Sequence, residues 1–175
     1  YIGSVVDHLA RNEHFGPEEP GVPNNVMLPW RQSLYARPNK RSGTFGAFLG
    51  TNHDPLWTEF HGEAPLGDPF RAITPKGRFT FGTGNASSQA KDALTRRRSL
   101  LSEFERHSTL MDRSPTVASY TDLRARAIDF LATSKVRDAL ALEREPVSLR
   151  EDYGMTLFGQ ACLTARRLLE SDVKF

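Results

Sequence analysis

Proline and glycine are concentrated in one half of this 175-residue chain, and this distribution constrains the fold most strongly. Nine of the eleven prolines and ten of the thirteen glycines lie between Gly16 and Gly84. Proline lacks the N–H that helices and inner strands need, so this half is expected to be irregular, with short extended pieces only at 26–28 and 78–81. The chain is therefore predicted to contain a helix at 1–15, an irregular lid-like region at 16–87 and a helical region at 88–175.

Apolar residues recur at helical spacing on both sides of the irregular region. Near the N-terminus, an apolar face is predicted from Ile2, Val5, Val6 and Leu9. In the helical region, a helix at about 90–111 is followed by one that starts after Ser114, with Pro115 in its first turn. The predicted buried stripe of this second helix is Tyr120, Leu123, Ala127, Phe130 and Leu131. A short helix after Ser134 should turn Val136, Ala139 and Leu140 inward and end before Pro146.

The last predicted helix covers about 155–171 and leads into an apolar run. Its buried face is predicted to hold Phe158, Ala161, Cys162, Ala165, Leu168 and Leu169, with Gln160, Thr164, Arg167 and Glu170 facing water. On this face Cys162 is a small core residue rather than a nucleophile. Residues 173–175 look like the start of a strand with no partner, so the chain is expected to be the central part of an α/β protein, packed against the remainder of its own polypeptide.

Composition excludes several classes of protein. Hydrophobic residues make up 38% and charged residues 25%, which is typical of a globular protein. The chain has 23 basic and 21 acidic residues, too small an excess to predict a nucleic-acid partner, and acidic residues interleave with the arginines around 96–98. No apolar run approaches the length of a membrane span.

One polar cluster in the irregular region has the residue types of a binding site. His53 and Asp54 are followed eight residues later by His61, beside aromatic residues. Imidazole and carboxylate groups at loop positions can hold a divalent metal or contact a substrate. Alternatively, Asp54 and Pro55 open a turn, and the histidines are ordinary surface residues. The spacing matches no established metal motif, so both interpretations stay open.

A second candidate is Arg150, which precedes Gly154 and the last predicted helix. An arginine at such a junction can bind a phosphate or sulfate in a bidentate manner, helped by the N–H groups of the helix N-terminus. In the structural alternative, Arg150 pairs with Glu151 and fixes the loop, while Gly154 supplies a backbone angle that other residues disfavour.

The most specific pattern of the chain is at its C-terminal end. It reads Arg150-Glu151-x-Tyr153-Gly154, then Phe158-Gly159-Gln160-x-Cys162-Leu163-x-Ala165-Arg166-Arg167-Leu168-x-Glu170, then Val173-x-Phe175. This pattern resembles a large bacterial family that is described as sulfatase-like or as a domain of unknown function, within the alkaline-phosphatase-like superfamily. Further stretches, from Ile2-Gly3-Ser4-Val5-Val6 to Glu145-Pro146, follow in the same order, so the resemblance covers nearly the whole chain.

The resemblance implies a fragment of an α/β/α sandwich, itself mostly helical with few short strands. Members of that superfamily hydrolyse sulfate or phosphate esters with a Ser, Thr or modified Cys nucleophile and metals held by Asp and His. It thus implies a divalent metal, zinc or calcium, and an exported protein, periplasmic or extracellular. None of the superfamily's catalytic residues can be carried onto a position of this chain, and Cys162 lacks the pattern that follows a sulfatase's modified cysteine.

Two functions follow as expectations. The first is a part of an exported metal-dependent hydrolase of sulfate or phosphate esters, acting on a sulfated or phosphorylated small molecule or polysaccharide. In it, His53, Asp54, His61 and Arg150 contact the substrate, and the catalytic residues lie outside this segment. The second is a non-catalytic protein of the same fold that binds carbohydrate, through Trp30 and Trp57, or serves assembly.

Overall fold

The computed structural model describes residues 2–13, 15–28, 45–63, 68, 70–81, 96, 97, 99, 100, 103 and 115–175, with side chains of the helix at 115–132 described from residue 120. The helices are α1 (Ile2–Asn12), α3 (Pro115–Ala132), α4 (Lys135–Leu140), α5 (Val147–Asp152) and α6 (Leu157–Glu170). The strands are β1 (Val26–Met27), β2 (Leu56–His61) and β3 (Arg78–Phe81), and single 3₁₀ turns lie at η1 (Ala47–Leu49), η2 (Thr51–His53) and η4 (Leu142–Arg144). Most of the predicted helix at 90–111, and Trp30, lie outside these residues.

The fold is mixed α/β, and its described strands form one sheet in the order β1-β2-β3. β1 runs parallel to β2, and β2 runs antiparallel to β3 with Thr58 opposite Phe81. β1 and β3 agree with the two predicted extended pieces, but the six-residue β2 was missed. It forms because its neighbours provide a ladder on both sides, and the Thr58 hydroxyl also donates to the Met27 carbonyl at 2.9 Å.

The last three residues form no strand of their own, contrary to the prediction, but they run beside β1. The N–H groups of Lys174 and Phe175 donate to the Asn24 carbonyl at 3.1 and 2.9 Å, and the Val26 N–H donates to the Phe175 carbonyl at 2.9 Å. Val173 is buried. The end of the chain is thus fastened to the entrance of β1 by three backbone hydrogen bonds.

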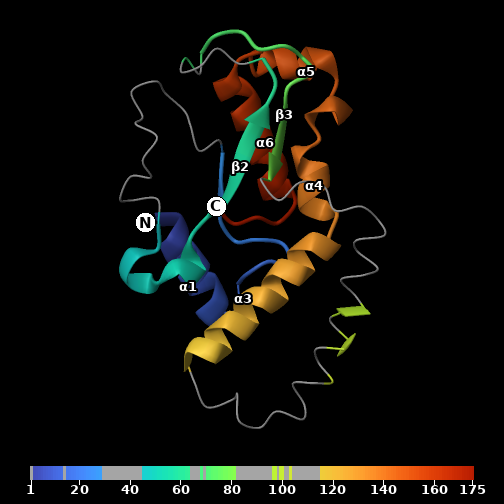
Figure 1. Ribbon diagram of the computed structural model, residues 1–175. Helices are drawn as coiled ribbons and strands as arrows, with labels where there is room; N and C mark the ends of the chain where they lie inside the picture. The colour runs from blue at the N-terminus through green and yellow to red at the C-terminus, as the bar shows by residue number, and fades with distance from the viewer. Residues whose placement is uncertain are drawn as a thin grey trace.

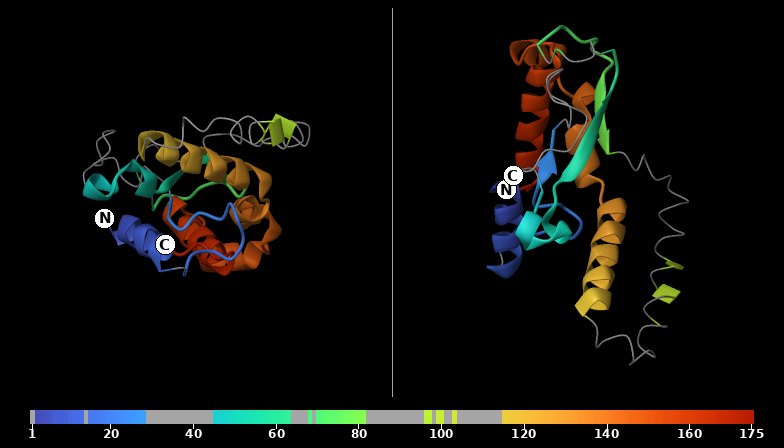
Figure 2. Two further views of the ribbon diagram at one scale, coloured as in Figure 1. Left: turned by 90° about the horizontal axis from the view of Figure 1, so that it is seen from below. Right: turned by 60° about the vertical axis from the view of Figure 1, so that its left-hand side comes forward.

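The hydrophobic core lies between β3, α4 and α6, and these elements lie above α1 and α3 in Figure 1. The turned view in Figure 2 shows the same division, with α6 along the strands and α3 reaching away from them. The core is formed by Val22, Ile73, Phe79, Phe81, Val136, Ala139, Leu140, Leu142, Leu157, Ala161, Leu163, Leu168 and Val173. The inward face predicted for α4 is therefore confirmed. No helix of the described residues has the length and apolar character needed to cross a membrane.

The predicted buried face of α1 is wrong. Ile2 is 70% exposed and Val5 and Leu9 are also exposed, whereas Asp7 and Ala10 on the other side are buried. The physical reason is a set of hydrogen bonds on the polar side of α1. Asp7 accepts hydrogen bonds from three other side chains, and these bonds hold the polar side of α1 against η2 and the segment before β1.

The predicted buried face of α6 is also displaced. Cys162, Phe158 and Leu169 are exposed, so Cys162 is not a core residue. Gln160 and Thr164, predicted to face water, are fully buried, while Ala161 and Leu168 are buried as expected. Burial of Gln160 is possible because its amide is fully used by Arg150 and Gly154 at 2.8–3.0 Å.

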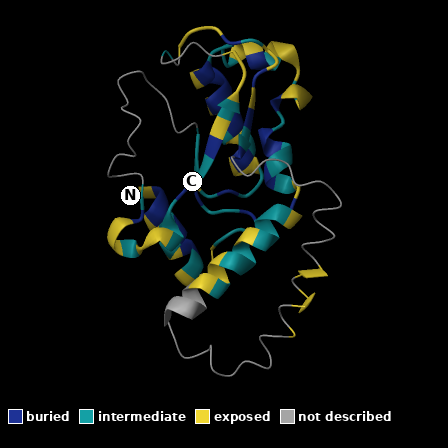
Figure 3. Ribbon diagram, in the orientation of Figure 1, coloured by how far each residue is buried: buried dark blue, intermediate teal, exposed yellow. Residues whose placement is uncertain are grey.

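Helix α3 is the least buried of the large elements. Figure 3 shows it mostly in the colours of intermediate and exposed residues, while buried residues gather on α4, α6 and the strands. Tyr120, Leu123 and Ala127 are exposed, so the predicted stripe is wrong at these positions. Phe130 is half-buried and packs edge-on against Phe81 with ring centroids 4.9 Å apart. The remainder of the stripe faces a cavity rather than the core.

Candidate functional site

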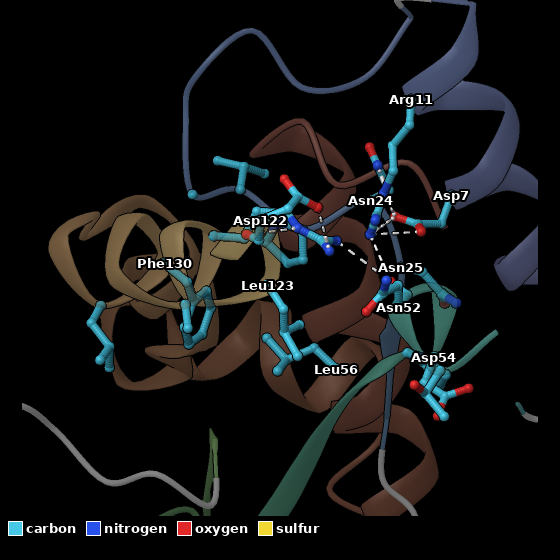
Figure 4. Close-up of a pocket in the computed structure, with 18 residues that line it drawn as sticks. Asp7, Arg11, Asn24, Asn25, Asn52, Asp54, Leu56, Asp122, Leu123 and Phe130 are labelled. Atoms are coloured by element: carbon cyan, nitrogen blue, oxygen red, sulfur yellow. Dashed lines mark hydrogen bonds and ion pairs between the residues drawn. The ribbon is translucent and has the colours of Figure 1, made fainter. Parts of the chain in front are cut away.

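A cavity of about 640 Å³ lies between α1, η2 and the start of β2, the 21–25 segment and α3. Its apolar wall consists of Val22, Pro23, Pro55, Leu56, Leu123, Ala127, Phe130 and Leu131. Its polar end is formed by Asp7, Arg11, Asn24, Asn25, Asn52 and, from α3, Asp122 and Arg126. Figure 4 shows Arg11, Asp7 and Asn24 gathered on one side, with Asp122, Leu123 and Phe130 projecting from α3 on the other.

Asp7 is the centre of the polar end and is only 4% exposed. Its Oδ1 accepts from Asn24 Nδ2 at 2.9 Å and from Arg11 Nε at 3.1 Å. Its Oδ2 lies 2.7 Å from both Arg11 Nη2 and His53 Nδ1. A buried carboxylate needs such donors to remain charged, so Asp7 is committed to holding its neighbours in place.

Two arginines reach the same backbone oxygen from opposite sides of the cavity. Arg11 Nη2 donates to the Asn52 carbonyl at 2.9 Å, and Arg126 Nη1 approaches it at 3.4 Å. Each arginine also pairs with an aspartate one helical turn earlier, since Arg126 Nη2 lies 2.8 Å from Asp122 Oδ2.

The charge of Arg126 is incompletely compensated. Burial lowers the pKa of its guanidinium, and the nearby positive charge of Arg11 lowers the pKa further. The carboxylates of Asp122 and Asp7 raise the pKa but do not reverse the shift. The third carboxylate of the lining, Asp54, is occupied elsewhere, because it accepts from the Gly46 N–H at 2.7 Å. The lining therefore holds two guanidinium groups beside three carboxylates, and burial and Arg11 together disfavour the charged form of Arg126.

The predicted group of His53, Asp54 and His61 is not assembled as a unit. His53 contacts Asp7 and does not line the cavity, whereas Asp54 does line it. His61 is exposed on β2, where its Nε2 lies 3.7 Å from Glu59 Oε2. Among the residues that the structure describes, no three His, Cys, Asp or Glu side chains are placed to hold a metal ion. These residues therefore do not fit the metal that the resemblance implies.

Arg150 is buried rather than exposed at the junction before α6, and its Nη2 makes no hydrogen bond within the described residues. It is 4% exposed and its Nε donates to Gln160 Oε1 at 2.9 Å. The same amide donates from Nε2 to the carbonyls of Arg150 and Gly154. Gly154 has a φ of 89°, as the structural alternative predicted, but the partner of Arg150 is Gln160 rather than Glu151.

The sequence analysis did not single out the candidate residues on α1 and α3 that line the cavity, although a signal existed. Asp7 with Arg11 and Asp122 with Arg126 share the spacing i, i+4, at which side chains of a helix meet. Such pairs are common on helix surfaces, so the spacing alone cannot reveal that two of them face each other. The packing of α1 and α3 around one cavity makes the pairs significant.

Comparison with known proteins gives a family but no activity. No curated protein matches the chain, and no solved structure matches it. One family model matches residues 1–175, and its description is "Protein of unknown function (DUF1501)". The match spans the cavity, the core and the Arg150–Gln160 contact together. The chain belongs to the DUF1501 family of proteins of unknown function.

Proposed function

We propose that the cavity binds the sulfate or phosphate group of an ester, and that the chain contributes substrate recognition to a metal-dependent hydrolase of such esters. The observation that carries this proposal is the convergence of Arg11 and Arg126 on the Asn52 carbonyl. A planar guanidinium suits the oxygen geometry of sulfate and phosphate, and two of them in a partly dry cavity favour a dianionic or monoanionic head group.

The apolar wall suits the organic part of such an ester. Leu56, Leu123 and Phe130 face the cavity beside the polar end, so an aromatic or aliphatic group can lie against them while the oxyanion contacts the arginines. Ligand sites commonly combine a mostly apolar lining with a few convergent polar groups. We assign the cavity a role in recognition and place the nucleophile and any metal outside it. The resemblance to exported sulfatase-like proteins supports a periplasmic or extracellular location as part of the same proposal.

Carbohydrate binding without catalysis is the second candidate, and one observation favours it. The amide oxygen of Asn24 is buried in the cavity wall and accepts no hydrogen bond within the described residues. A sugar hydroxyl is a suitable donor for it. The aromatic platform first expected at Trp57 is less favourable, because Trp57 is half-buried and packs against Phe45 with ring centroids 5.7 Å apart.

Replacing Arg126 by glutamine tests the oxyanion site. We expect p-nitrophenyl sulfate and p-nitrophenyl phosphate to bind the wild-type chain in calorimetric titrations, and Arg126→Gln to weaken binding at least tenfold, because the least compensated guanidinium is removed. Inorganic sulfate should bind more weakly than the aryl ester, which also covers the apolar wall. If the wild-type chain also releases p-nitrophenolate and Arg126→Gln does not, the result would extend from recognition to hydrolysis.

Arg144→Gln is the matched control. Arg144 also pairs with an aspartate, Asp138, at 2.9 Å, but it lies on the surface away from the cavity. The Arg144→Gln variant should bind both aryl esters with an affinity within twofold of wild type. The proposal fails if neither ester binds, or if both variants weaken binding equally. Binding of neutral sugars in place of the esters, unaffected by Arg126→Gln, would favour the carbohydrate alternative.

A further inference from the structure

His8 of α1 and His53 of η2 face each other in a partly buried position, and neither lines the cavity. His8 Nδ1 and His53 Nε2 are 3.5 Å apart, and the two rings meet edge to face with centroids separated by 5.0 Å. The separation exceeds the usual 2.7–3.2 Å of a nitrogen hydrogen bond, so a direct hydrogen bond between the rings is weak. A weak hydrogen bond between the rings does not by itself explain why the two imidazoles are held so close together.

The other nitrogen of each ring is firmly held. His53 Nδ1 lies 2.7 Å from Asp7 Oδ2, and His8 Nε2 lies 2.9 Å from the amide nitrogen Nδ2 of Asn12, which donates to it in this orientation of the amide. Asp7 is an ionised acceptor with several donors, so His53 carries its proton on Nδ1 and leaves the Nε2 lone pair toward His8. The amide of Asn12 can present its oxygen to His8 Nε2–H after rotation by half a turn, which leaves the Nδ1 lone pair toward His53.

We propose that His8 Nδ1 and His53 Nε2 chelate one divalent transition-metal ion, with zinc as the preferred occupant. Two nitrogens on one tetrahedral zinc, each about 2.0–2.1 Å from the ion, stand about 3.3–3.4 Å apart, close to the separation in this structure. A carboxylate behind a ligating histidine orients the ring and raises its basicity, which is the position of Asp7 behind His53. The chain supplies two ligands, and water or a bound ligand takes the remaining positions.

This site differs from the metal site first expected from the sequence. Of the three residues first expected, only His53 is a ligand of this site. His8 is the second ligand, and Asp7 supports His53 without contacting the metal. Hard oxygen-preferring cations are excluded as occupants, because both ligand atoms are imidazole nitrogens, which suit zinc, copper and nickel rather than calcium or magnesium. Neither histidine lines the cavity proposed for the ester, but the two sites share Asp7, whose Oδ2 contacts both Arg11 and His53.

Zinc titration of the untagged 175-residue chain tests the proposal. We expect uptake of one Zn²⁺ per chain, and at least tenfold weaker binding in His8→Ala and in His53→Ala, because each removes one of two protein ligands. His61→Ala is the control, since this exposed histidine on β2 lies in a separate pair with Glu59. It should bind zinc as wild type does. Mg²⁺ and Ca²⁺ should give no binding to the same chain.

A measurement on the wild-type chain keeps the test valid if a variant fails to fold. In imidazole ¹H–¹⁵N NMR spectra, substoichiometric Zn²⁺ should shift the His8 Nδ1 and His53 Nε2 signals and leave the His61 signals in place. The proposal is overturned if zinc is not taken up, if the His61 signals shift first, or if His61→Ala loses as much affinity as the other two variants.

Discussion

Replacing Gln160 by alanine is expected to lower the free energy of unfolding by about 3–4 kcal/mol. Gln160 is fully buried, and its amide makes three hydrogen bonds, one from Arg150 Nε and two to the backbone carbonyls of Arg150 and Gly154. The substitution leaves the Nε donor of a buried guanidinium and two carbonyls without these partners and also creates a cavity. Chemical denaturation followed by circular dichroism measures the loss.

Two further variants separate the causes. Gln160→Met keeps most of the volume and removes only the hydrogen bonds, so it should still lose about 2–3 kcal/mol. Cys162→Ala lies on the exposed side of the same helix and should change stability by less than about 0.5 kcal/mol. If Gln160→Met is as stable as wild type, the hydrogen bonds of the amide contribute nothing and this explanation is wrong.

Replacing Gly159 by alanine is expected to lower the free energy of unfolding by about 2–4 kcal/mol, although alanine is the better helix former. Inside a helix, replacing glycine by alanine normally raises the free energy of unfolding by up to about 1 kcal/mol. At this position a Cβ atom would lie 2.2 Å from the Tyr153 carbonyl oxygen and 2.4 Å from that of Gly154. Both atoms belong to backbone held between α5 and α6, so neither can move away without breaking the turn.

Gly154→Ala is the comparison for this prediction. Gly154 lies just before α6, whereas Gly159 lies within it. Gly154 has a φ of 89°, and a Cβ atom added there would contact only Thr156 Oγ1, at 3.9 Å. Its cost is the left-handed backbone alone, about 1–2 kcal/mol. Thermal and urea unfolding of both variants should rank Gly159→Ala as the less stable. A Gly159→Ala chain that matches or exceeds wild-type stability would show that the close approach of the two carbonyls is not maintained.

These two positions explain why the C-terminal pattern of the sequence is so specific. Arg150, Gly154, Gly159 and Gln160 belong to one buried contact that joins α5 to α6. Arg150, expected to bind an anion, and Gln160, expected to face water, are both buried in this contact. The groups available to a ligand lie instead on α1 and α3, far from that pattern in sequence.

Local patterns determined where most described elements lie. Proline at position 115 and the apolar spacing within α4 placed their helices correctly, because capping and periodicity act over a few residues, and the extended piece predicted at 78–81 is β3. Strand β2 escaped this reasoning, since its six residues become a strand only when β1 and β3 provide hydrogen-bond partners on either side.

The sequence by itself determined helices α1, α3, α4 and α6 and membership of a family of unknown function, but not α5 or β2, while the tertiary structure decided which faces are buried and where a cavity forms. Hydrophobicity placed Ile2 and Cys162 inside, but the structure buries Asp7 and Gln160 in their place. Burial removes these polar groups from water, and hydrogen-bond partners on neighbouring elements of the fold replace the water. The cavity likewise depends on two aspartate–arginine pairs, 115 residues apart, that meet only when α1 and α3 pack around Asn52.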